Sequence, residues 1–230
     1  MVVHSHHDHA MDSSDVARIT NAVVFGSEST ANIATAIGLP DDQIAIVDKK
    51  RTLRFDQFKV TMIKSKHSPV PAFLAWLTGH NQSISAPFPA SPRLTDYKEG
   101  GSYAVILEHP LGNILVHASA GFTPDLLSPY QADYVFLGIA GLSKQSDEFK
   151  QHYFRETIGA VGAHTVIPIH WDNFMVPIGE GLVTAHPLID NISQSISDLS
   201  TYINNHPSTS LTLMNAWESI LLNSASNHST

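Results

Sequence analysis

The stretch that decides the fold is His4-Ser5-His6-His7-Asp8-His9, which begins at the fourth residue of the chain. Four histidines and one aspartate within six residues are typical of a metal site. On an extended segment or in a tight loop, His4 and His6 point the same way and can hold one metal ion. Asp8 and His9 lie one turn further on and can face a second. Metal ligands must be neutral imidazoles or ionised carboxylates, and these residues supply both near neutral pH.

A purification tag, a metal-scavenging histidine-rich tract or chance would also place several histidines in a short stretch. Tags are usually unbroken runs of histidine, whereas this stretch is interrupted by serine and aspartate. Further along, His67 closes the strand-like segment 58–67, and His170 closes the apolar segment 166–170. Histidines at strand ends lie at the rim of a sheet, where sites are commonly built. The pattern therefore favours a specific metal site, formed when the chain folds, over these alternatives.

The composition is that of a globular protein, with 43% hydrophobic and 15% charged residues among 230. This length suits one large domain or two small ones. The net charge of −8 argues against nucleic acid as a partner. The chain has no cysteine, so a metal must be held by imidazole and carboxylate, which suits zinc, iron or manganese. No apolar run approaches the ~20 residues of a membrane helix.

Strand-like and helix-like segments alternate, which predicts an α/β domain with mixed sheets covered by helices. Strands are expected at 22–25, 44–47, 58–67, 134–138, 166–170 and 211–214, with a hairpin of 103–109 and 113–119. Helices are expected after a cap at Ser27 or Ser29, over 145–161 and over 190–205. Residues 68–100, rich in Pro, Ser and Gly, are expected to be irregular.

The order His-x-His-x-Asp-His, with His67 and the segment Ile167-Pro168-Ile169-His170-Trp171, resembles the metallo-β-lactamase superfamily of metallohydrolases, and its ascorbate-lactonase-like branch in particular. The resemblance spans His4 to His170. It implies a four-layer αββα sandwich with the metals at one edge between the sheets. We therefore expect a single domain of this kind over 1–222, followed by a polar tail over 223–230.

The resemblance also implies a ligand set. His4, His6 and His67 would hold one metal, and Asp8, His9 and His170 the other. The cofactor would be one or two Zn²⁺ ions, with Mn²⁺ or iron as alternatives. A metal-activated water would attack an ester, lactone or phosphodiester bond, and Asp8 would act catalytically by orienting that water.

One position departs from the family pattern. Members usually carry an aspartate that bridges the two metals, and the matching position here is Ser119. Serine is a poor neutral ligand, so the second metal should bind more weakly. His117 lies two residues earlier on the same strand face and could substitute, or it could be a packed, hydrogen-bonded strand histidine. A degenerate metal-binding protein without catalysis is therefore the competing class, and an iron-dependent redox role a smaller one.

The early position of the motif predicts a truncated chain. In the family, roughly 50 residues of strands precede the motif, so we expect the N-terminal strands to be absent. An exposed sheet edge would follow, which a homo-oligomer could cover. The expected partner is a small-molecule substrate, not nucleic acid or a membrane. The cytoplasm is the default compartment, since any signal peptide would lie in the missing segment.

Overall fold

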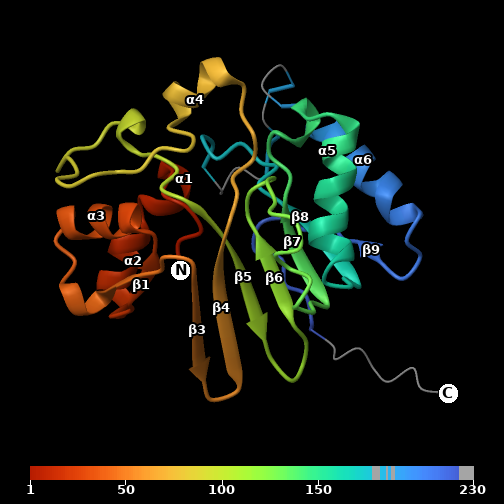
Figure 1. Cartoon of the computed structure of the whole chain (residues 1–230), viewed down its shortest axis with the longest axis horizontal. Coiled ribbons are helices and arrows are strands. Elements are labelled where there is room, and N and C mark those ends of the chain that lie inside the picture. Colours follow the sequence, from red (N-terminus) through yellow and green to blue (C-terminus); the bar gives the residue numbers. More distant parts are fainter. Residues whose placement is uncertain (178–181, 185, 188–189, 223–230) are drawn as a thin grey trace. The chain divides into compact units, whose positions relative to one another are not determined.

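The computed structural model in Figure 1 describes residues 1–177, 182–184, 186–187 and 190–222. The chain forms two compact units. Unit 1 comprises Met1–Arg51 and Met62–Tyr103, and unit 2 comprises Thr52–Thr61 and Ala104–Thr230. Each unit is described by itself. The single domain expected over 1–222 stays a prediction, and the polar tail expected over 223–230 lies outside the described residues.

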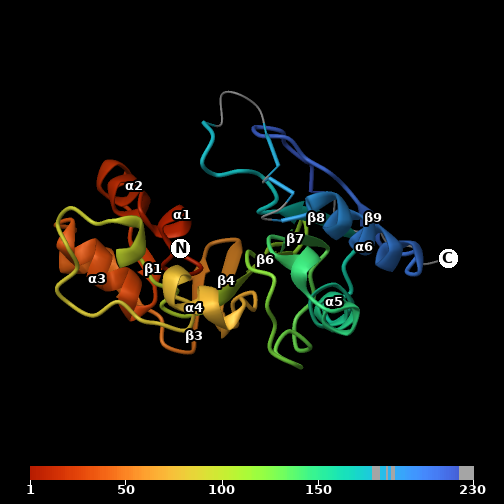
Figure 2. The same cartoon turned by 90° about the horizontal axis from the view of Figure 1, so that it is seen from above.

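Unit 1 is built around a short parallel pair of strands. Its elements are α1 (His7–Ala10), α2 (Ser13–Thr20), β1 (Val24–Gly26), α3 (Glu28–Ala36), η1 (Asp41–Gln43), β2 (Ile44–Ile46), α4 (Ala72–Thr78) and η2 (Leu94–Asp96). Strands β1 and β2 pair in parallel, and α2 and α3 lie beside β1 in Figures 1 and 2. Ile33, Ala34 and Phe88 belong to the buried cluster between these elements.

Seven strands form one mixed sheet in the order β3-β4-β5-β6-β7-β8-β9. Their bounds are β3 (Lys50–Phe55), β4 (Phe58–Ser65), β5 (Ser102–Glu108), β6 (Ile114–His117), β7 (Tyr134–Gly138), β8 (Thr165–Ile169) and β9 (Ser210–Leu211). Strands β5 and β6 are antiparallel, which confirms the predicted hairpin, and β6 to β9 pair in parallel.

Helices of unit 2 pack beside its parallel strands. They are η3 (Leu142–Lys144), α5 (Asp147–Phe154), the π-helical turn η4 (Arg155–Gly159) and α6 (Ile192–Asn204). Helix α6 contacts α5 and β9, as Figures 1 and 2 show. Tyr153, Phe154 and Leu199 are among the fully buried side chains. Alternating strands and helices give the predicted α/β class.

The carboxyl ends of β6, β7 and β8 meet at one edge of the sheet. In the register, His117 lies opposite Leu137, and Gly138 opposite Ile169. His170 follows β8 directly and has a φ of 57°. Because parallel strands bring their carboxyl ends together, this edge of unit 2 collects His117 and His170.

The prediction that residues 68–100 are irregular is wrong in one place, because α4 occupies 72–78. Pro71 precedes this helix, and Gly79 ends it with a φ of 67°. Proline at the start and glycine after the end of an apolar run are helix signals. Strand β3 and helices α1 and α2 were also not predicted. No helix of the described residues is long and apolar enough to cross a membrane.

Candidate metal centre

The first residues of the chain are held as an extended segment by backbone hydrogen bonds. Tyr103 N–H donates to the Val3 carbonyl at 2.8 Å, and Ser5 N–H donates to the Glu99 carbonyl at 2.7 Å. The backbone of His6 is also extended, with φ −63° and ψ 156°. Of the two geometries that the sequence left open, an extended segment or a tight loop, the backbone at His6 has the extended one.

Side chains alternate along this segment. Ser5 is fully buried, and its hydroxyl hydrogen-bonds with Thr30 at 2.8 Å and with Ser27 at 3.2 Å, both at the start of α3. Successive side chains of an extended segment point to opposite sides. His4 and His6 accordingly face away from α3, on the side where His67 lies.

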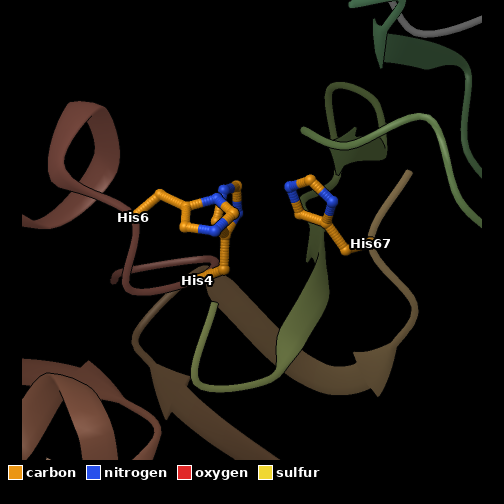
Figure 3. Close-up of side chains that lie close together, drawn as sticks. All are labelled: His4, His6 and His67. Atoms are coloured by element: carbon orange, nitrogen blue, oxygen red, sulfur yellow. The ribbon is translucent and has the colours of Figure 1, made fainter. Parts of the chain in front are cut away.

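His4, His6 and His67 form a compact three-histidine cluster in unit 1, shown in Figure 3. Each pair of rings has its centroids 4.9 Å apart in an edge-to-face arrangement. One nitrogen from each ring lies within 4.8 Å of the others. Three converging imidazole nitrogens from two segments more than fifty residues apart can hold one metal ion.

The hydrogen bonds of these rings leave nitrogens available for a metal. His67 Nδ1 lies 2.9 Å from the Ser68 carbonyl, which fits a donated bond and leaves Nε2 with a lone pair. His6 bonds the backbone of Thr78, while its Nε2 is covered and has no hydrogen-bond partner. His4 Nδ1 is likewise covered and unbonded. Buried nitrogens without partners are costly, and a metal ion satisfies them.

The environment keeps the three rings neutral. Burial is the main cause that lowers the pKa of His4 well below 6.5, and the neighbouring histidines add to it. Burial, followed by the charge of His67, lowers the pKa of His6 to about 4. Burial also lowers the pKa of His67, against a hydrogen bond to the Ser68 backbone. Neutral imidazole is the form that binds metal.

Asp8 and His9 lie on α1, close to this cluster. An Asp8 oxygen lies 3.3 Å from His9 Nε2, and the other lies 3.5 Å from His7 Nδ1. The His9 ring lies 3.9 Å from that of His4, centroid to centroid. Unit 1 thus places two further potential ligands beside the three histidines. The roles of Asp8 and His9 as ligands of a second metal stay predictions.

The remaining predicted residues lie in unit 2. His117 is buried, and its Nε2 lies 2.5 Å from the Gly121 carbonyl. This contact is compatible with the alternative of a packed, hydrogen-bonded strand histidine. Ser119 follows the end of β6, whereas the predicted strand ran to Ser119. The ligand roles of His117, Ser119 and His170 stay predictions.

Two residues beside the cluster were missed by sequence reasoning. One nitrogen of His80 and one oxygen of Glu99 lie within 4.8 Å of each other and of a His67 nitrogen. Neither His80 nor Glu99 belongs to the motif or to the ligand set that the resemblance implies. The local sequence signal was the pair Gly100-Gly101 that follows Glu99, because adjacent glycines indicate a close approach of the backbone. Both glycines have a positive φ in the structure.

Comparison with known proteins identifies the fold. Igni18, a metallo hydrolase from Ignicoccus hospitalis, matches with a TM-score of 0.57 at 14% identity, over 95% of this chain and 76% of its own. The metallo-β-lactamase fold protein YhfI from Bacillus subtilis matches with a TM-score of 0.51 at 14% identity, over 92% and 72%. CmlA, a diiron β-hydroxylase from Streptomyces venezuelae, matches with a TM-score of 0.52 at 15% identity, over 92% and 42%.

No family model and no curated protein matches the sequence. The structural matches nevertheless extend over nearly the whole chain, and the chain has the metallo-β-lactamase fold. The resemblance seen in the sequence is therefore confirmed at the level of the fold. The four-layer arrangement and the absence of N-terminal strands stay predictions.

Proposed function

We propose that this protein is a metal-dependent hydrolase whose first metal ion is held by His4, His6 and His67. The observation that carries the proposal is the convergence of three neutral rings, two of which have buried nitrogens without hydrogen-bond partners. Three neutral nitrogen ligands suit Zn²⁺, with Mn²⁺ or iron as alternatives. When bound, such an ion supplies Lewis acidity and lowers the pKa of a coordinated water.

Residues of the chain perform the remaining tasks. The Ser68 carbonyl and the Thr78 backbone hold two of the rings by their second nitrogens, which orients them as ligands. Asp8 lies between His7 and His9, where its carboxylate can orient water and accept its proton. The substrate that we propose is a small molecule with an ester, lactone or phosphodiester bond.

A second, weaker metal completes the proposal. Asp8, His9 and His170 would hold it, as the family resemblance implies. Because Ser119 stands where the resemblance implies a carboxylate, this ion would be held with one negative charge fewer, so we expect it to dissociate first. The same serine favours the alternative function, a metal-binding protein without catalysis.

Metal analysis and activity together test this proposal. The wild-type protein is expected to retain at least one zinc per chain and to hydrolyse p-nitrophenyl esters or bis-p-nitrophenyl phosphate. His67→Ala should lose the zinc and reduce turnover by at least about a hundredfold, because a ligand is removed. His164→Ala, at an exposed histidine of unit 2, is the matched control and should retain both properties.

The outcomes separate the candidates. Zinc binding that depends on His67, without turnover of any tested ester or diester, would favour the non-catalytic alternative. Iron in place of zinc, with oxygen consumption rather than hydrolysis, would favour the iron-dependent redox role. Equal zinc content in wild type and His67→Ala would sink the proposed site itself.

A further inference from the structure

We infer that Glu99 is a positioning residue of the three-histidine site: its main chain holds Ser5, and its buried carboxylate places a negative charge beside His67 and His80. This inference rests on the metal-binding part of the proposed function. It concerns a residue that neither the motif nor the resemblance to the family singles out.

The main chain of Glu99 holds the motif directly. Its carbonyl accepts the Ser5 N–H bond at 2.7 Å, and Ser5 stands between His4 and His6. The following residue, Gly100, has a φ of 68°, and a Cβ there would lie 2.5 Å from the Ser29 Cβ and 2.9 Å from the Ser5 hydroxyl. Only glycine allows this close approach without strain. The Glu99–Gly100 backbone therefore sets the position of both ligands.

The carboxylate of Glu99 is itself fixed. The side chain is buried, with 5% of the residue exposed. One oxygen accepts the Asn81 N–H at 2.7 Å, and the other accepts the Ser102 hydroxyl at 3.2 Å. Two neutral donors orient this group, yet they supply no positive charge. A buried carboxylate is costly unless a cation or strong donors compensate for its lost hydration.

The one ion-pair contact of Glu99 within the described part of the chain leads to the metal site. His80 Nδ1 lies 3.3 Å from a Glu99 oxygen, but it is covered and forms no hydrogen bond in this geometry. The His80 ring lies 5.5 Å from the His67 ring, centroid to centroid. One Glu99 oxygen, one His80 nitrogen and one His67 nitrogen all lie within 4.8 Å of one another, so the carboxylate lies beside a proposed metal ligand.

Charge balance gives the Glu99 carboxylate a role in addition to that of Asp8, whose charge acts on His4 and His6. The three neutral histidines contribute no charge to balance a dication. A buried negative charge beside His67 favours a cation at the cluster, because attraction between charges is strong where water is excluded. Outer-shell partners of metal ligands typically change metal affinity by about 10- to 100-fold.

Glu99→Gln is the variant that separates charge from structure. The glutamine oxygen can accept the Asn81 N–H, and its amide can donate to the Ser102 hydroxyl, so both hydrogen bonds survive. Glu28→Gln makes the same chemical change at an exposed position of unit 1 and serves as the matched control. Zn²⁺ affinity is measured by competition with a chelating dye, and apo-protein stability by thermal unfolding.

Glu99→Gln is expected to bind Zn²⁺ at least about tenfold more weakly, at unchanged stoichiometry and with an apo melting curve like that of the wild type. The cobalt-substituted variant should also show a shifted visible spectrum. Glu28→Gln should match the wild type throughout. If Glu99→Gln does not fold, His80→Gln keeps the question open to test, with an expected loss on the order of tenfold.

Three results are distinguishable. A wild-type protein that binds no metal would refute the proposed function as well as this inference. Wild-type affinity in Glu99→Gln or, where that variant does not fold, in His80→Gln would overturn the inference alone. A drop in stoichiometry by one ion, with the affinity of the remaining ion unchanged, would also overturn it, because Glu99 would then be a ligand of a separate site.

Discussion

His4, His6 and His67 all have lowered pKa values, so each ring resists protonation. Burial is the largest cause that lowers the pKa of each ring, and the charge of neighbouring histidines lowers it further. A folded chain without metal therefore holds a cluster of neutral imidazoles that the unfolded chain would protonate in mild acid. This difference in proton binding links the stability of the apo-protein to pH.

The pH dependence follows from the lowered pKa of His6, about 4 in the folded chain against 6.5 ordinarily. Between these values the unfolded chain binds a proton that the folded chain does not. The contribution of His6 to the free energy of unfolding is therefore complete above pH 6.5. It is lost progressively as the pH drops toward 4. At about 1.4 kcal/mol per pKa unit, His6 alone accounts for roughly 3 kcal/mol.

Urea unfolding at pH 7.5 and pH 4.5, with a chelator present, measures this effect. His6→Gln should flatten the profile, since the group that titrates differently is gone. A His6→Gln profile as steep as that of the wild type would contradict the assignment. Saturating zinc should steepen the wild-type profile, because protons and metal compete for the same nitrogens.

Sequence reasoning located the cluster at the residue scale but not its surroundings. Spacing and resemblance singled out His4, His6 and His67, and the structure brings them together; their role as ligands stays a prediction. Glu99 could not be found in this way. A buried acid looks like a surface acid in one sequence, because its burial depends on contacts with residues as distant as Ser5.

At the scale of elements, the start of α3 is coupled to the metal motif. Ser27 accepts the Thr30 N–H at 3.3 Å as the cap of this helix, and its hydroxyl also lies 3.2 Å from that of Ser5. The sequence predicted a cap at Ser27 or Ser29, and the structure selects Ser27. One serine thus caps the first turn of a helix and supports the segment that carries two histidines.

A pair of cap substitutions tests this coupling. Ser146 caps α5 in unit 2 by accepting the Phe149 N–H at 3.2 Å. Ser27→Ala and Ser146→Ala should each lower the free energy of unfolding by about 1 kcal/mol. Only Ser27→Ala should also weaken zinc binding, because only Ser27 touches the motif. Equal zinc affinity in both variants would show that the cap and the metal site are independent.

Elements with strong local signals were predicted well. Strand 134–138 has the expected bounds, and helix α6 runs from Ile192 to Asn204 within the predicted 190–205. Helix α4 was missed because its seven residues are too short for helical periodicity to emerge from a segment dominated by proline and serine. Strand β3 was missed because charged residues obscure its alternation; five of its six residues are exposed.

At the scale of the whole molecule, bound zinc should stabilise the folded state against unfolding. At a free concentration a hundredfold above its Kd, a ligand that binds only the folded state adds about 2.7 kcal/mol to the free energy of unfolding. Hydrogen exchange with and without zinc shows where this energy acts. We expect added protection at the Ser5 and Gly100 amides in unit 1, and none in His67→Ala.

The location of the protection discriminates between one metal and two. Protection confined to unit 1 is expected at the lowest zinc concentrations that saturate the three histidines. Additional protection around His170 in unit 2, appearing only at higher zinc, would support the second, weaker ion. Protection of unit 2 without unit 1 would contradict the assignment of the tighter site.

The hydrogen bond from Ser5 to the Glu99 carbonyl also has a consequence in time. Synthesis proceeds from the N-terminus at about 5–20 residues per second, so His4 and His6 leave the ribosome on the order of 5–20 s before Glu99. During that interval the motif can bind metal only as part of an incomplete chain. His67 is absent for most of the interval and Glu99 for all of it. Which metal the finished protein carries can thus depend on which ion the nascent chain meets first, and on whether folding releases it.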